Sequence, residues 1–174
     1  MSSAATIERD YAALRPSVRG GSDHASSRRR FLEQTWAAFG DPSPTPDRRT
    51  VSWIGFYERD PSDASQMLLL DREPKPACSP IGLHGMCGRG MIDAAAIIID
   101  NVRTLGPNYI ACDPRDQSEL VIPVFGADGV CTGVLDVDSY AIGAFREHDV
   151  HGLHELLVAF GLTSRTNLPR IVRL

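Results

Sequence analysis

The sequence lacks any apolar run that approaches the about 18 residues of a membrane span. Its N-terminal segment is polar and charged, without the apolar core of a secretory leader. It also lacks an excess of basic residues, since its formal net charge at pH 7 is −4. Binding to an anionic membrane or to a nucleic-acid backbone needs a basic surface, so we expect neither partner and predict a cytoplasmic, reducing location.

Cysteine is scarce, with four residues among 174, and no two cysteines have the Cys-x-x-Cys spacing. This scarcity and spacing exclude a disulfide scaffold, a zinc ribbon and a thioredoxin motif. We therefore expect free thiols unless chemistry oxidises them. The remaining composition, 43% hydrophobic and 23% charged, is that of a globular protein, and a chain of this length can bury a core of its own.

The pattern of apolar residues divides the chain into three regions of one domain. Residues 1–49 have helical spacing around Tyr11 and over Phe31–Phe39, followed by a proline-rich linker. Residues 50–162 form the core and end in a helix, and residues 163–174 are predicted to be a tail. The expected strands are 50–60, 66–70, 96–100, 118–125 and 130–139. This order predicts an α+β fold, a central, mostly antiparallel sheet of about five or six strands with the N- and C-terminal helices packed on one face.

Acidic residues occur on strands that otherwise have the pattern of a core. In the segment VLDVDS, Asp136 and Asp138 point to one face because strand side chains alternate. The dipeptide Asp128-Gly129 predicts a type I′ hairpin, and its register brings Glu119 close to Asp138. Like charges at that range raise at least one pKa, so the cluster should share a proton or bind a cation. A solvent-facing role and a divalent-metal site are the alternatives.

The segment WIGFY places Trp53, Gly55 and Tyr57 on one strand face. The glycine would leave a gap between two aromatic walls, which an S-methyl group could enter with favourable sulfur–aromatic contacts. The alternative is a core face that uses the glycine for close backbone packing.

Three of the four cysteines fall in predicted loops. Cys78 and Cys87 lie in a segment rich in glycine and proline, and Cys112 lies in a second long loop. Such loops suit a nucleophilic thiol and a resolving partner, although structural cysteines are the alternative. Asp113 is expected to raise the pKa of Cys112. By strand parity, Cys131 is predicted to be a buried packing residue on the face opposite Asp136.

Taken in order, several short segments resemble the free-methionine-(R)-sulfoxide reductases, a branch of the GAF domains. These segments are SWIGFY, KPAC, GMCG, YIACD followed by SELVIP, and GVLDVDS. The resemblance extends over about Val51–Leu157 and implies a GAF-like catalytic core. It departs from the family in the loop IGLHGMCGRG, which is one residue short between Cys78 and Cys87, and at Tyr109.

The resemblance implies that Cys112 attacks the sulfur of free methionine-(R)-sulfoxide. Cys78 or Cys87 would then resolve the sulfenic acid as an intramolecular disulfide, with Cys78 favoured for the first bond. The acidic pocket and the aromatic wall would be formed by Glu119, Asp136, Asp138, Trp53 and Tyr57, with Glu119 and Asp138 also catalytic. No bound cofactor and no metal are expected. The reductant would be an external dithiol such as thioredoxin, supplied ultimately by NADPH, and a homodimer is compatible with the helices. The alternative is a non-catalytic GAF module that senses a small ligand or a redox change.

Overall fold

A computed structural model of the chain describes residues 8–16, 23–41, 43, 50–109 and 112–174. The helical segments are η1 (Ala12–Leu14), α1 (His24–Phe39), α2 (Met86–Ile92), η2 (Val102–Asn108) and α3 (Glu147–Ala159). The strands are β1 (Trp53–Arg59), β2 (Gln66–Glu73), β3 (Ile81–Gly82), β4 (Ala95–Ile99), β5 (Ser118–Phe125), β6 (Cys131–Ser139) and β7 (Arg170–Arg173). No helix in these described ranges combines the length and the apolar character that crossing a membrane requires.

The strands form one sheet in the order β3-β2-β1-β6-β5-β4-β7. All neighbouring strands pair antiparallel except β4 and β7, which run parallel. The predicted α+β fold is confirmed, but the sheet has seven strands rather than the expected five or six. The predicted tail contributes one of the additional strands, because β7 covers the edge of the fully buried β4.

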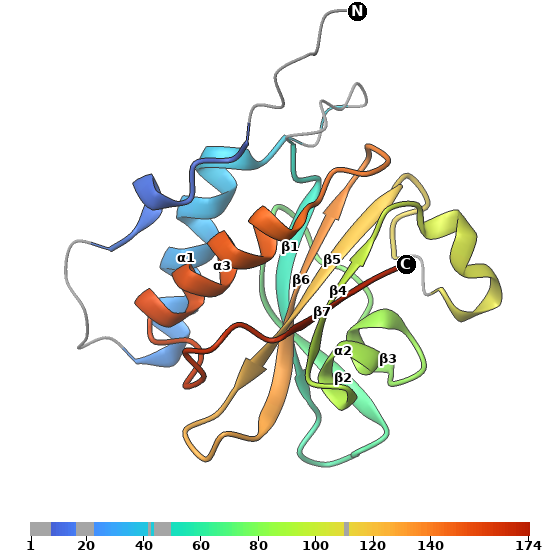
Figure 1. Cartoon of the computed structure of the whole chain (residues 1–174). Coiled ribbons are helices and arrows are strands. Elements are labelled where there is room, and N and C mark those ends of the chain that lie inside the picture. Colours follow the sequence, from blue (N-terminus) through green and yellow to red (C-terminus); the bar gives the residue numbers. More distant parts are fainter. Residues whose placement is uncertain (1–7, 17–22, 42, 44–49, 110–111) are drawn as a thin grey trace, which may run out of the picture.

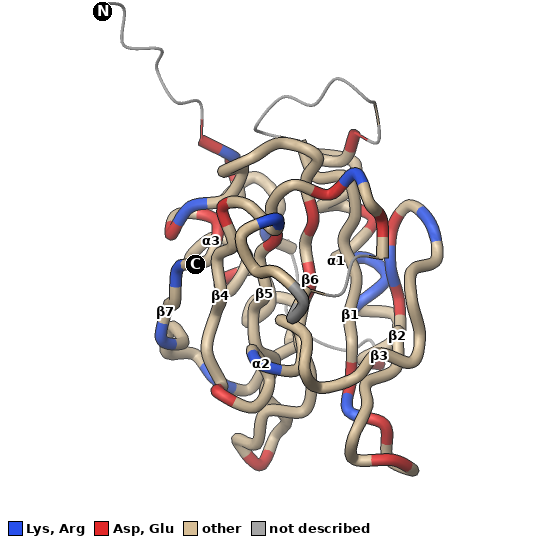
Figure 2. Tube along the Cα trace, turned by 90° about the vertical axis from the view of Figure 1, so that its right-hand side faces the viewer, with Lys and Arg blue, Asp and Glu red and all other residues tan. Residues whose placement is uncertain are grey.

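The two faces of the sheet carry different elements (Figure 1). Helices α1 and α3 lie on one face, where Phe31 and Leu153 pack against Ile54 and Leu135. Helix α2 lies on the other face, with the loops that precede β3 and β5 nearby; Figure 2 views the molecule from this side. The prediction that the N- and C-terminal helices share one face is confirmed. The candidate site lies on the opposite face of the sheet, which carries α2.

The N-terminal region differs in detail from the sequence prediction. In the described stretch around Tyr11 the only helical element is the short 3-10 helix η1. Residues 1–7, 17–22, 42 and 44–49 of the predicted region lie outside the described residues. Helix α1 starts at His24, before the predicted helix, because the side chain of Asp23 accepts a hydrogen bond from Ser26 N at 3.0 Å. Its N-terminus is therefore set by a cap rather than by the apolar stripe.

The β5–β6 hairpin reaches the predicted register through a different turn. The turn spans 126–129, closed by a hydrogen bond from Gly129 N to the carbonyl of Gly126, with Gly129 at φ +78°. Thr132 then forms a bulge opposite Val124 and Phe125, which shifts the register by one residue. This shift moves Cys131 to the α2 face, where it packs half-buried beside the second apolar cluster. The prediction that Cys131 is a buried packing residue on the face opposite Asp136 is therefore wrong.

Candidate active site

Three neighbouring strands bring the predicted acids and the tryptophan into one row. Glu119 on β5 pairs with Asp138 on β6, and Asp138 pairs in turn with Trp53 on β1. One pleat further along, Asp136 lies opposite Gly55. Residues directly opposite in antiparallel strands point to the same face, so the predicted cluster of three acids forms on the α2 face.

The two aromatic side chains of β1 form one wall but leave no gap between them. A Cβ atom on Gly55 would lie 2.4 Å from Cη2 of Trp53, so the indole itself fills the space above the glycine. The ring centroids of Trp53 and Tyr57 are 6.1 Å apart. The prediction of an open slot between two aromatic walls is wrong, because the glycine allows the indole to fold onto its own strand.

The polar ends of both aromatic residues hold the loop that follows β2. Trp53 Nε1 donates to the carbonyl of Lys75 at 2.8 Å, and the Tyr57 hydroxyl donates to the carbonyl of Cys78 at 2.8 Å. Buried tryptophan and tyrosine usually satisfy their polar atoms in this way. These bonds fix the position of Cys78 relative to β1.

The three predicted reactive cysteines converge from separate elements. The Cys112 thiol is hydrogen-bonded to the side chain and to the backbone of Cys78, and both residues are exposed. Cys87 is buried on α2 and is hydrogen-bonded to Asp136. Helix α2 lies close to the preceding turn because Gly88 has no side chain: a Cβ there would lie 2.2 Å from the carbonyl oxygen of Leu83.

A cavity of about 30 Å³ lies between the α2 face of the sheet and these loops. Cys78 does not line it but adjoins it through Cys112. All other predicted site residues contribute to its wall: Trp53, Tyr57, Cys87, Cys112, Glu119, Asp136 and Asp138. The structure thus places two of the three predicted thiols and all three predicted acids around one cavity, with Cys78 beside it.

Burial keeps the acids of this cavity protonated to unusually high pH. It raises the pKa of Asp136 to about 7 and, together with the charge of Asp136, raises the pKa values of Glu119 and Asp138 well above their ordinary range. Oδ1 of Asp136 is buried and has no hydrogen-bond partner among the described residues. The site therefore offers proton donors and one free acceptor to a polar ligand.

The thiol of Cys112 is held largely in its neutral form. Although the residue as a whole is exposed, it lines the cavity, and partial burial there, followed by the hydrogen bond with Cys78, raises its pKa to about 12. Asp113 is not among its main causes, contrary to expectation, because Lys75 Nζ at 2.6 Å and Arg115 Nη2 at 2.7 Å neutralise that carboxylate. The same two cations lower the pKa of Asp113.

One group in the cavity has the donor atoms of a metal site. The Sγ atom of Cys87 and carboxylate oxygens of Glu119 and Asp136 lie within 4.8 Å of one another. Metal ligands must lose their protons, whereas burial raises the pKa values of all three groups. The arrangement suits proton donation better than cation binding.

Comparisons with known proteins agree with this geometry. No family model matches the sequence. The free methionine-R-sulfoxide reductase of Saccharomyces cerevisiae is 32% identical over 107 residues, 61% of this chain and 59% of that protein. The solved structure of the free methionine-R-sulfoxide reductase from Neisseria meningitidis in complex with its substrate has a TM-score of 0.69 and 27% identity, covering 86% of this chain and 80% of that one. A putative GAF sensor protein from Burkholderia vietnamiensis has a TM-score of 0.71 and 30% identity, covering 86% and 90%.

The chain belongs to the GAF domains, and it is similar to free methionine-R-sulfoxide reductases. The match spans only 59% of the length of the yeast protein, less than two thirds. The comparisons therefore support the fold, while the site and the activity of this chain depend on its own residues.

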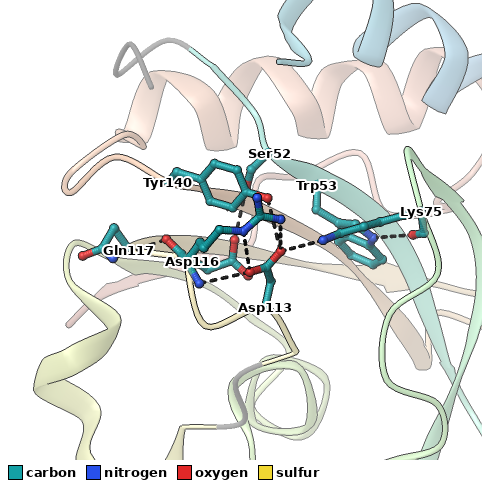
Figure 3. A network of polar contacts seen from close by, with 8 residues as sticks. Ser52, Trp53, Lys75, Asp113, Asp116, Gln117 and Tyr140 are labelled. Carbon is teal, nitrogen blue, oxygen red and sulfur yellow. Dashed lines mark hydrogen bonds and ion pairs between the residues drawn. The ribbon is translucent and has the colours of Figure 1, made fainter. Parts of the chain in front are cut away.

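Six residues of the cavity wall were not predicted as site residues from the sequence: Ala77, Ile81, Gly85, Met86, Tyr109 and Asp116. Asp116 is the most consequential, because it adds a fourth buried acid and accepts a hydrogen bond from Ser52 Oγ at 3.2 Å (Figure 3). Burial and the nearby charge of Asp113 raise its pKa to about 6. It lies in an irregular loop where no periodicity indicates orientation, and its short distance in sequence from Glu119 was the only available signal.

Proposed function

We propose that this chain is an oxidoreductase that reduces free methionine-(R)-sulfoxide to methionine with its own thiols. The observation that supports it most directly is the convergence of Cys112, its neighbour Cys78 and protonated acids on one cavity beside an indole. Reduction of a sulfoxide needs a nucleophile for the sulfur and a proton for the oxygen. Both are available here within one enclosed space.

In the first step, Cys112 Sγ attacks the sulfoxide sulfur while Glu119 or Asp138 protonates the sulfoxide oxygen. The oxygen, which takes the thiol proton and the proton of the acid, leaves as water when the sulfur–oxygen bond breaks, and a sulfonium intermediate remains with a bond between Cys112 Sγ and the methionine sulfur. A water molecule then attacks Cys112 Sγ, and the sulfur–sulfur bond breaks. This releases methionine and a proton and leaves a sulfenic acid on Cys112. Because the pKa of Cys112 is about 12, little thiolate exists at neutral pH, and protonation of the oxygen supplies much of the acceleration. The free acceptor on Asp136 can take a donor hydrogen from the ammonium group of a free amino acid. The indole of Trp53 offers a favourable surface to the S-methyl group.

In the second step, the thiol of Cys78 attacks the sulfenic sulfur, and a disulfide and water form. Cys78 is better placed than Cys87 for this reaction, because it is hydrogen-bonded to Cys112 while Cys87 is bonded to Asp136. Both residues of the resulting disulfide are exposed in the reduced protein, which suits reduction by an external dithiol such as thioredoxin. That reductant, the cytoplasmic location and the homodimer stay predictions.

A coupled assay tests the proposal. The reduced protein is supplied with thioredoxin, thioredoxin reductase and NADPH, and is offered free methionine-(R)-sulfoxide, its S epimer and the N-acetylated R form. We expect NADPH consumption with the free R epimer alone. Turnover that is absent with thioredoxin and with a small dithiol, or equal for both epimers, would contradict the proposal. A sensor module, the alternative function, would bind the compound without consuming thiols, and it gives no reason for three cysteines to gather here.

A further inference from the structure

Two loops without regular secondary structure carry the thiols that are to react. Cys78 lies between β2 and β3, and Cys112 lies between η2 and β5. A disulfide forms only when the two Cα atoms are about 4.4 to 6.8 Å apart and the sulfurs face each other. The relative placement of these loops therefore decides how fast the second step can occur.

Each loop is fastened separately to β1 and the residues beside it. The carbonyls of Lys75 and Cys78 accept hydrogen bonds from the side chains of Trp53 and Tyr57. In the other loop, Asp116 accepts a hydrogen bond from Ser52 Oγ. These bonds hold the loops to the sheet but do not join one loop to the other.

The ammonium group of Lys75 bridges the two loops (Figure 3). Its Nζ lies 2.6 Å from Oδ2 of Asp113, the residue that follows Cys112. The Asp113 side chain is mostly buried, with 13% exposed, whereas that of Lys75 is 45% exposed. Lys75 precedes Cys78 by three residues, so this ion pair closes a short ring of chain around the two thiols.

Asp113 has further partners that do not cross between the loops. Arg115 donates to both of its oxygens, from Nε at 3.0 Å and from Nη2 at 2.7 Å, and the Tyr140 hydroxyl donates at 3.2 Å. Loss of Lys75 would leave this carboxylate with two partners and would not strand a buried charge. The contribution of Lys75 to loop placement can therefore be separated from a contribution to folding.

We propose that Lys75 is a positioning residue for disulfide formation: its ion pair with Asp113 holds Cys78 against Cys112. The inference rests on the proposed function for its role in turnover. In the step concerned, the sulfur–oxygen bond of the Cys112 sulfenic acid breaks and a sulfur–sulfur bond to Cys78 forms. The proton of the Cys78 thiol leaves with the hydroxyl group as water. Rapid closure also protects the sulfenic acid from further oxidation.

The test compares Lys75→Met, Lys75→Arg and Arg115→Met with the wild-type chain. Reduced protein is mixed with free methionine-(R)-sulfoxide, quenched at intervals with a sulfenic-acid trap, and analysed by mass spectrometry. In Lys75→Met we expect disulfide formation to slow by about fivefold, the effect a partly exposed ion pair supports, with more trapped sulfenic acid and an unchanged rate of methionine release. Lys75→Arg keeps the charge and should restore the rate. Arg115→Met removes a cation within one loop and should leave disulfide formation unchanged.

The dependence of the rate of disulfide formation on salt distinguishes an electrostatic role of Lys75 from a purely structural one. Screening at about 1 M salt should slow disulfide formation in the wild type and leave Lys75→Met unaffected. A wild-type rate in Lys75→Met, or no recovery in Lys75→Arg, would overturn the inference.

The same series with hydrogen peroxide as oxidant separates the inference from the proposed function, because peroxide generates the sulfenic acid without any sulfoxide reductase activity. A wild type that releases no methionine but shows Lys75-dependent closure under peroxide would refute only the proposed function. A wild type that forms no Cys78–Cys112 disulfide under peroxide would overturn the inference itself.

Discussion

Cys112 faces a cavity whose acids keep protons that surface acids lose well below neutral pH. Burial raises the pKa values of Glu119 and Asp138, and it also holds the thiol in its neutral form, with a pKa of about 12. The nucleophile is thus poorly ionised while the proton donors are well protonated. At the residue scale, the proposed reaction therefore depends more on the side chain that donates a proton to the sulfoxide oxygen than on a preformed thiolate.

Replacement of the proposed nucleophile gives the first prediction. Cys112→Ser should abolish turnover of free methionine-(R)-sulfoxide, because a hydroxyl group cannot form the sulfenic acid. The matched control is Cys131→Ser, which changes a half-buried cysteine outside the cavity wall and should retain wild-type turnover. Both are measured by the coupled assay, and measurable turnover in Cys112→Ser would assign the attack to another residue.

Replacement of a proton donor gives the second prediction. Asp138→Asn should lower kcat/KM by about 10² to 10⁴ because an amide cannot protonate the sulfoxide oxygen. The free energy of unfolding at pH 7 should not fall, since a buried acid is removed. Asp100→Asn changes a carboxylate that is 40% exposed and paired with Arg173, and should leave activity unchanged. If Asp138→Asn lost stability and activity in parallel, its role would be structural.

At the scale of elements, the pairing register of the strands brings the residues of the site together. The β1, β6 and β5 strands align Trp53, Asp138 and Glu119 in one row, and the loops on the α2 face enclose it. Strand β7 contributes from a distance: it pairs with β4, which in turn pairs with β5. The edge that β7 covers would otherwise expose a strand that is buried along its whole length.

Removal of β7 gives the third prediction. Deletion of residues 170–174 should lower the free energy of unfolding by about 3 kcal/mol, because partly buried side chains are lost from the core. The uncovered edge of β4 should also promote association. Arg173→Ala removes only the exposed ion pair with Asp100 and should cost less than about 1 kcal/mol. Chemical denaturation and light scattering measure both effects, and a truncated chain as stable and as monomeric as the control would contradict this view of β7.

The same strands and loops explain which parts of the fold and of the site could be predicted from the sequence. Glu119 and Asp138 could be placed together because alternation fixed the face of the acids and the hairpin expected at Asp128-Gly129 gave the register between the two strands. Cys131 was misplaced because a one-residue bulge reverses parity and leaves no mark in the pattern. Strand β7 is too short to show alternation, and Asp116 lies in a loop, where orientation depends on tertiary contacts such as that with Ser52.

At the scale of the whole molecule, the chain carries a modest negative charge but buries four acids in one cavity. In the unfolded chain these carboxyl groups would titrate at about pH 4. In the folded protein the pKa is about 6 for Asp116 and about 7 for Asp136, and burial also raises the pKa values of Glu119 and Asp138 well above their ordinary range. The native state therefore binds more protons than the unfolded state between these limits. The contribution of these four acids to the free energy of unfolding is therefore greatest below about pH 4. It declines as the pH rises from about 4 through 7.

The fourth prediction tests this linkage. Asp136→Asn should raise the free energy of unfolding at pH 8 by about 2 to 4 kcal/mol and change it little at pH 4. Asp113→Asn should act with the opposite sign, because ion pairs lower the pKa of Asp113 and its stabilisation is present at neutral pH and lost as the pH falls. Denaturant unfolding of both variants across this range provides the measurement. An Asp136→Asn effect that is independent of pH would show that the carboxyl group is not protonated by burial.

The measurement that tests the central claim most directly is a single turnover without any external reductant. Fully reduced protein is mixed with excess free methionine-(R)-sulfoxide, and released methionine is counted beside a peptide map of the cysteines. We predict about one methionine per chain, a disulfide between Cys78 and Cys112, and free thiols at Cys87 and Cys131. Release of no methionine, or release with Cys112 still reduced, would contradict the convergence of thiols and acids as the basis of activity.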